Sequence, residues 1–283
     1  MRILVVGGAG YIGSVCAELL LDEGHAVAIF DNLSEGHRRA VDSRAEFFEG
    51  DLANAEQIRS ALTAFKPESV MHFAASALVA ESMENPSKYF RNNIGNGLNL
   101  LDAMVATGVK RIVFSSTCAT FGPPERVPID ESLPQRPINP YGESKLAFEK
   151  ILRWFDEIHG LRFVALRYFN AAGASECIRD YIHILDLARA HLLALQTPKS
   201  EFYNLGTGGG MSVREVIESC REITGHQIPV VEKPRRAGDP PRLIAASEKI
   251  QRELGWRPQF QNIDTIIESA WKWHQKFPNG YGD

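Results

Sequence analysis

Short apolar runs alternate with longer amphipathic stretches through the first 170 residues. The short runs are rich in β-branched and aromatic residues and are bounded by Gly, Pro, Asn, Asp or Ser, which is typical of buried strands. They predict strands at residues 3–6, 26–30, 45–49, 70–73, 111–115 and 163–168. Between several of them, apolar positions recur with helical spacing, predicting helices at residues 11–23, 55–65 and 87–107.

A regular alternation of strands and helices indicates a parallel sheet covered by helices on both faces. The predicted fold class is therefore α/β, a Rossmann-type doubly wound parallel sheet. After residue 169 the pattern breaks into shorter pieces, with a Pro- and Arg-rich stretch at 229–241 and a last amphipathic helix at 263–276. We expect a first domain at residues 1–170 and a smaller C-terminal lobe at residues 171–283.

Composition and charge exclude some classes of function. Of the 283 residues, 31 are Lys or Arg and 35 are Asp or Glu, a formal net charge of −4. Such a chain has no general attraction for nucleic acid or for anionic membranes. The apolar residues 2–6 run directly into a glycine turn, and the sequence has no apolar run long enough to span a membrane. We expect a cytoplasmic protein with no nucleic-acid or membrane partner.

The cysteines and histidines show no spacing that suits a metal ion. Cys16, Cys118, Cys177 and Cys220 lie far apart with no C-x-x-C pair, and the eight histidines show no ligand pattern. We expect small buried thiols and no metal site.

A glycine-rich turn follows the first predicted strand. Residues 7–13 read GGAGYIG, the next predicted helix follows at once, and the second strand ends in Asp31. Gly7, Gly10 and Gly13 suit a tight turn, the close approach of a pyrophosphate and helix–strand contact. The helix N-terminus offers free N–H groups to phosphates, and an acid at this interval binds ribose hydroxyls. The pattern predicts a dinucleotide site that favours NAD over NADP, although Arg38 and Arg39 lie nearby.

A candidate acid–base pair opens a later helix. Tyr141 and Lys145 are four residues apart, so they share one helix face, although such a pair also occurs by chance at a solvated helix edge. The strand at 111–115 ends in Ser115-Ser116-Thr117, at the carboxyl edge where open α/β sheets hold ligands. A tyrosine with a pKa of about 10 is a poor base at neutral pH, and lowering that pKa by three units takes roughly 4 kcal/mol. A cation about 4 Å away supplies roughly that amount at an effective dielectric of 20. We expect Lys145 and an oxidised nicotinamide to act in this way.

Taken together, these motifs resemble the extended short-chain dehydrogenase/reductases. More specific segments are similar to the UDP-glucose 4-epimerases of that family, and the likeness covers nearly the whole chain. These segments are FDNLS at 30–34, HFAA at 72–75, NN at 92–93, SSTCATFG at 115–122, YFNAAG at 168–173, CIRDYIH at 177–183 and RRAGD at 235–239.

The resemblance implies an NAD-dependent epimerisation of UDP-glucose and UDP-galactose at C4, through a 4-keto sugar. The implied catalytic residues are Thr117, Tyr141 and Lys145. The implied NAD-binding residues are Gly7, Gly10, Tyr11, Ile12, Gly13, Asp31, Asn32, Asp51, Leu52, Phe73, Ala74, Ala75, Asn92, Ser115, Lys145 and Phe169. The implied UDP-sugar-binding residues are Thr117, Asn170, Arg179, Arg236 and Asp239. Family members are commonly homodimers, so a homodimer is expected as well.

Two alternatives remain open at this point. A dehydratase or decarboxylase of the same family shares the scaffold, but dehydratases carry an Asp-Glu pair where this chain has Cys118-Ala119. A non-catalytic NAD sensor has no need of Thr117, Tyr141 and Lys145 together.

The likeness to the epimerases also skips a few dozen residues between Ser175 and Glu176. We therefore expect that a segment around the uridine is missing from the sequence at this junction.

Overall fold

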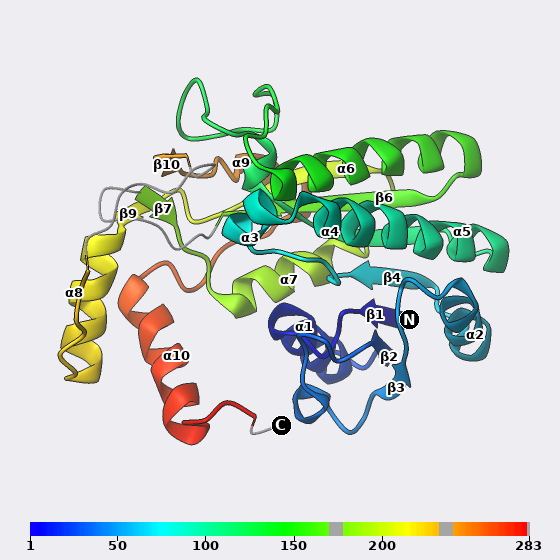
Figure 1. Ribbon diagram of the computed structural model, residues 1–283, viewed down its shortest axis with the longest axis horizontal. Coiled ribbons are helices and arrows are strands. Elements are labelled where there is room, and N and C mark those ends of the chain that lie inside the picture. The colour runs from blue at the N-terminus through cyan, green and yellow to red at the C-terminus, as the bar shows by residue number, and fades with distance from the viewer. Residues whose placement is uncertain (170–177, 232–239, 282–283) are drawn as a thin grey trace.

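The computed structural model describes residues 1–169, 178–231 and 240–281. Its main feature is a sheet of seven parallel strands in the order β3-β2-β1-β4-β5-β6-β8, with helices on both faces (Figure 1). Its strands are β1 (Arg2–Val6), β2 (Ala26–Asp31), β3 (Glu46–Glu49), β4 (Ser69–His72), β5 (Arg111–Thr117), β6 (Arg162–Tyr168) and β8 (Glu201–Leu205). The order reverses at β1, the arrangement of a doubly wound sheet, and the predicted fold class is confirmed.

Alternate side chains of each central strand enter two separate cores, because successive residues of a strand point to opposite faces. Ile3 and Val5 pack with α1 (Tyr11–Asp22) and α7 (Ile184–Ala194). Leu4 and Val6 pack with the opposite layer. That layer consists of α2 (Ala55–Phe65), α5 (Gly97–Thr107) and α6 (Pro140–His159).

The predicted helix at 87–107 is one helical run with an irregular centre. It comprises α4 (Pro86–Phe90), a π-helical segment (Arg91–Asn96) and α5. The π segment places Asn93 so that its amide donates to Ser76 O at 3.0 Å and to Ser144 Oγ at 2.9 Å. Because π segments are rare and often lie at functional sites, this departure from a regular helix draws attention to the region around Ser76.

The large sheet extends beyond the predicted domain boundary at residue 170. Strand β8 pairs in parallel with β6, which continues the sheet at its edge. Sequence patterning missed this strand, because Glu201–Leu205 stands alone after an irregular stretch. A division of the chain at residue 170 therefore does not coincide with the division between the two sheets.

A second, three-stranded sheet lies beside the carboxyl edge of the first. Its order is β10-β7-β9, with β7 (Ile178–Asp180), β9 (Gly210–Ser212) and β10 (Arg242–Leu243). The remaining helices are α3 (Val79–Glu84), α8 (Val213–Thr224), α9 (Glu248–Leu254) and α10 (Ile263–Lys276). In Figure 1, α8 and α10 lie side by side at one end of the molecule, and the two helices contact each other. Within the described residues, every helix is too short or too polar to cross a lipid bilayer.

A buried carboxylate joins the second sheet to the first. Asp180 is fully buried and accepts hydrogen bonds from Thr207 N at 2.7 Å, Thr207 Oγ1 at 2.6 Å, Gly208 N at 2.9 Å and Ala245 N at 3.1 Å. Thr207 and Gly208 follow β8, whereas Ala245 follows β10. Asp180 therefore fixes the loops after β8 and β10 relative to β7.

Asp180→Ala is expected to lower the free energy of unfolding by about 3 kcal/mol or more, because it leaves several buried donors without an acceptor. Thr207→Val is the matched control and should cost only about 1 kcal/mol, since it removes one donor of the same cluster. Urea denaturation followed by circular dichroism measures both values. Equal stability of Asp180→Ala and the wild type would contradict this account.

Candidate cofactor and active site

The turn after β1 has no room for side chains. Gly7 has a φ of +80°, and a Cβ there would lie 2.5 Å from Ala74 N. A Cβ at Gly13 would lie 2.2 Å from Gly7 O, so the start of α1 rests directly on the turn. Gly10 caps α1 without any side-chain hydrogen bond, which leaves the first N–H groups of the helix for a ligand. This arrangement suits a pyrophosphate.

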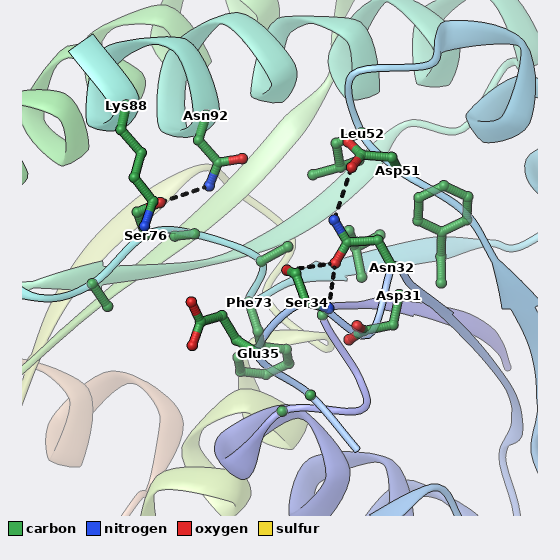
Figure 2. Close-up of a pocket in the computed structure, with 18 of the residues that line it drawn as sticks. Asp31, Asn32, Ser34, Glu35, Asp51, Leu52, Phe73, Ser76, Lys88 and Asn92 are labelled. Atoms are coloured by element: carbon green, nitrogen blue, oxygen red, sulfur yellow. Dashed lines mark hydrogen bonds between the residues drawn. The ribbon is translucent and has the colours of Figure 1, made fainter. Parts of the chain in front are cut away.

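A pocket of about 520 Å³ opens beyond the carboxyl ends of the central strands (Figure 2). Ten of the residues expected to bind NAD line it: Gly7, Gly10, Asp31, Asn32, Asp51, Leu52, Phe73, Ala74, Ala75 and Asn92. Tyr11, Ile12, Gly13, Ser115, Lys145 and Phe169 do not line it. The sequence analysis missed further lining residues in the loops after β2 and β4 and in α3 and α4, namely Ser34, Glu35, Gly36, Ser76, Ala77, Leu78, Glu81 and Lys88. For Ser34, Glu35, Gly36 and Ser76, a position just after two expected strand ends was the available signal, whereas Glu81 and Lys88 lie farther along the chain.

The acid at the end of β2 holds the turn in place. Asp31 Oδ2 accepts from Ala9 N at 3.0 Å, and Oδ1 accepts from Leu33 N at 2.8 Å. A carboxylate accepts about four hydrogen bonds, so both oxygens keep capacity for the hydroxyls of a ribose. Figure 2 shows Asn32 beside it, donating to Asp51 Oδ2 at 2.8 Å and accepting from Ser34.

Charged side chains make this pocket acidic. Asp31, Glu35, Asp51 and Glu81 line it, whereas Lys88 is the one Lys or Arg among the described lining residues. Lys88 Nζ forms an ion pair with Glu81 at 2.5 Å. The N–H groups at the start of α1 are therefore the groups placed to stabilise phosphate charge, while the acids suit sugar hydroxyls. Both properties match a dinucleotide such as NAD.

The first turn of α6 positions the candidate acid–base pair. Asn139 Oδ1 accepts from Gly142 N at 2.7 Å, and Pro140 occupies the first helical position, so the helix begins at a defined residue. Tyr141 therefore lies in the first turn and Lys145 one turn later. The structure brings the Tyr141 phenol close enough to the Thr117 hydroxyl for the hydroxyl to act on the pKa of the phenol.

Lys145 lies beneath this pair, in the interior. Its Nζ donates to Ser115 O at 2.8 Å and lies 4.7 Å from the centre of the Phe114 ring. The side chain is 3% exposed. Burial lowers the pKa of Lys145 to about 7, and the carboxylate of Glu149 opposes part of this fall.

The ionisation of Tyr141 differs from the expectation. Burial raises the pKa of Tyr141 to about 12, although part of its side chain is exposed, and the hydrogen bond with Thr117 opposes the rise. The Lys145 ammonium, which was expected to lower this pKa, donates to Ser115 O on the backbone of β5. In this state of the site, the phenol of Tyr141 is therefore protonated at neutral pH.

The pocket and the catalytic helix are linked by Asn93. Its Oδ1 accepts from Ser76 N at 2.9 Å on the pocket wall, and its Nδ2 donates to Ser144 Oγ at 2.9 Å. Ser144 Oγ in turn donates to Tyr141 O at 2.8 Å. A chain of hydrogen bonds thus joins the pocket wall to the first turn of α6, in which Tyr141 lies.

The residues expected at the UDP-sugar are mostly not placed by the structure. Asn170, Arg236 and Asp239 lie outside the described residues, as does the junction of Ser175 and Glu176. Arg179 is 1% exposed, and its Nη1 donates to Ile178 O at 3.0 Å and Pro241 O at 3.2 Å, so it does not face an open pocket.

Phe169, which was expected to bind NAD, lies in the interior beside the end of β5. Phe169 packs in a small buried cluster with Cys118 and Leu243. Cys118 follows Thr117 directly, so this cluster begins next to the end of β5. Among the described residues, no group of His, Cys, Asp and Glu side chains is arranged to hold a metal ion.

Comparisons with known proteins agree with this geometry. Residues 3–178 match the model of the NAD dependent epimerase/dehydratase family, and residues 171–269 match that of GDP-mannose 4,6 dehydratase. The UDP-glucose 4-epimerase of Lacticaseibacillus casei is 45% identical over 329 residues, covering 100% of this chain and 99% of the relative. That alignment is longer than the 283 residues of this chain, so the relative has residues without a counterpart here.

Solved structures give the same result. The UDP-glucose 4-epimerase of Brucella ovis in complex with NAD is 42% identical, with a TM-score of 0.89 over 94% of this chain and 96% of that one. The enzyme of Bifidobacterium longum in complex with NAD+ and UDP is 32% identical, with a TM-score of 0.94 over 99% of this chain and 100% of that one. The chain therefore belongs to the NAD dependent epimerase/dehydratase family.

Proposed function

We propose that the chain is a UDP-glucose 4-epimerase that uses NAD. The observation that carries this proposal is the assembly of Tyr141, Thr117 and Lys145 at the edge of the sheet that also holds the dinucleotide pocket. The relatives described above have this activity by name, and two of the solved structures contain NAD.

In this reaction Tyr141 takes the proton of the sugar 4-hydroxyl and later returns it. Bound NAD supplies the acceptor and donor of hydride, so that no net oxidation occurs. Thr117 hydrogen-bonds the same oxygens and keeps the phenol aligned. The 4-keto sugar turns over between the two transfers, which exchanges the face that receives hydride.

NAD is favoured over NADP because of Asp31. This carboxylate is 9% exposed and lies at the end of β2, where the ribose of a dinucleotide is expected. It accepts hydrogen bonds from ribose hydroxyls but repels a 2′-phosphate. Asn170, Arg236 and Asp239 remain our candidates for contact with the UDP-sugar.

The dehydratase alternative is disfavoured by the residues beside Thr117. Elimination of water needs an additional acid and base, whereas the chain has Cys118 and Ala119 there. Burial raises the pKa of the Cys118 thiol to about 12, so this group does not serve as a base near neutral pH. An NAD sensor would not require Thr117 and Tyr141 to lie close together.

We also propose that the enzyme is a cytoplasmic homodimer. Helices α4 and α6 contact each other on one side of the molecule (Figure 1) and carry exposed apolar side chains. Phe90 is 39% exposed, Trp154 60% and Ile158 67%. Such side chains are typical of an interface. Cys16, Cys118 and Cys220 are free thiols, as is usual in a reducing compartment.

Tyr141→Phe is expected to abolish epimerisation, because it removes the hydroxyl that carries the proton and keeps the ring. The bound NAD should remain. Conversion of UDP-galactose to UDP-glucose and the NAD content of the purified protein measure the two effects. Near-normal turnover would contradict the mechanism and favour a binding protein.

Thr117→Val should cost less, about 1 to 3 kcal/mol or roughly five- to 150-fold in rate, since it removes one hydrogen bond and keeps the base. The same assay measures this loss, with thermal melting as a control because Thr117 also accepts from Ala119 N at 3.2 Å. A larger loss than that of Tyr141→Phe would mean that the two roles are exchanged.

Activity on UDP-N-acetylgalactosamine is expected as well. In this family a bulky aromatic residue after the RRAGD-like motif is associated with exclusion of acetylated sugars, and Leu243 stands at the equivalent position. Leu243 is 3% exposed and packs with Phe169 next to the catalytic strand end. Rates for the acetylated and plain sugars, in the wild type and in Leu243→Tyr, test this. Strict rejection of the acetylated sugar by the wild type would contradict it.

A further inference from the structure

A buried ion pair lies behind the acid–base pair. Glu149 Oε1 accepts from Arg167 Nε at 2.8 Å, and Oε2 accepts from Arg167 Nη2 at 2.7 Å. Both side chains are 2% exposed. This two-point geometry is the strongest form of contact between guanidinium and carboxylate, and it fixes the orientation of both groups.

The same carboxylate makes two more contacts, with different parts of the fold. Ser116 Oγ donates to Oε1 at 2.6 Å and Gln135 Nε2 donates to Oε2 at 3.1 Å. Ser116 stands between Ser115 and Thr117 in β5, and Arg167 lies in β6. One side chain of α6 therefore binds the catalytic helix to both strands and to the loop before the helix.

Glu149 also lies one helical turn after Lys145, on the same buried face of α6. The charge of its carboxylate acts on the Lys145 ammonium. Two other titratable groups lie on elements next to Lys145: Tyr141, one turn earlier on α6, and His72 on β4. Burial and the charge of Lys145 lower the pKa of His72 to about 3, so this ring is neutral and gives no counter-charge.

We propose that Glu149 is a positioning residue for Lys145: its four hydrogen bonds fix α6 against β5 and β6, and its carboxylate, one helical turn away, favours the charged form of the buried ammonium. Arg167 orients the carboxylate. This inference rests on the proposed function only for the role of Lys145 in the reaction.

The proposal has a consequence for stability that can be measured without turnover. The pKa of Lys145 in the folded protein, about 7, lies below its ordinary value of 10.5. Between these values the unfolded chain binds one proton more than the folded chain, so the free energy of unfolding rises with pH across this window. Loss of the Glu149 charge should lower the pKa of Lys145 further and move the start of this rise to lower pH.

The experiment is urea unfolding of the purified protein at a series of pH values from roughly 6 to 10. Each protein is compared with the same protein carrying Lys145→Met, so that only the contribution of Lys145 remains. For the wild type, the free energy of unfolding minus that of Lys145→Met should begin to rise near pH 7. In the Glu149→Gln background, the same difference in the free energy of unfolding should begin to rise about one pH unit lower.

Arg167→Met is the matched control. It breaks the same buried ion pair but leaves the carboxylate on the helix. When Arg167→Met is compared with Arg167→Met/Lys145→Met, the rise in the free energy of unfolding should therefore not begin at a lower pH. Glu143→Gln, an exposed change of the same charge on the same helix, should behave as the wild type.

An unchanged onset in Glu149→Gln, or an equal downward shift in Arg167→Met, would overturn the proposal. If Glu149→Gln does not fold, the double variant Glu149→Gln/Arg167→Met removes both charges and is compared with Arg167→Met, with the same shift expected. Urea unfolding does not depend on turnover. A negative result for the Glu149 proposal can therefore be told apart from a negative result in the UDP-galactose assay, which tests the proposed function.

Discussion

The contact between the backbones that follow β1 and β4 is the constraint on which the pocket depends. Gly7 lies so close to Ala74 that a Cβ would overlap the backbone, and the first turn of α1 lies equally close to Gly7. Because β1 pairs with β2 on one side and β4 on the other, this contact also sets where Asp31 and Phe73 face the pocket. A side chain at the turn would separate the helix N-terminus from both strand ends.

Lys145 differs from the buried carboxylates Asp180 and Asp186 in how far the protein replaces the lost hydration of its charge. Lys145 is held in the interior with one backbone acceptor and a nearby carboxylate, and it loses hydration that the protein only partly replaces. Elsewhere, buried carboxylates are fully occupied: Asp186 accepts from Gln259 N and Phe260 N, and Asp180 from four donors. The latter groups stabilise loops, whereas Lys145 stays poised between two protonation states near neutral pH.

Local pattern predicted the elements that carry their own signal. Helices α2 and α10 have the expected bounds, and the six expected strands occur within two residues of their predicted ends. Strand β8 escaped because it stands alone after an irregular stretch, so that only its pairing with β6 shows it to belong to the sheet. The π segment at Arg91–Asn96 escaped for a similar reason, since its irregularity accompanies contacts of Asn93 with Ser76 and Ser144.

The sequence by itself determined the fold class, through the alternation of strands and helices, and it predicted the glycine turn and the Tyr141–Lys145 pair, because each of these motifs lies within a short stretch of chain. Only the tertiary structure decided how those groups ionise and what surrounds them. Hydration is lost through packing of α6 on β5 and β6, and the partners of Glu149 come from three separate segments. The pKa of Tyr141 rises to about 12 for the same reason. Burial depends on which surfaces meet, and no local stretch of sequence contains that information.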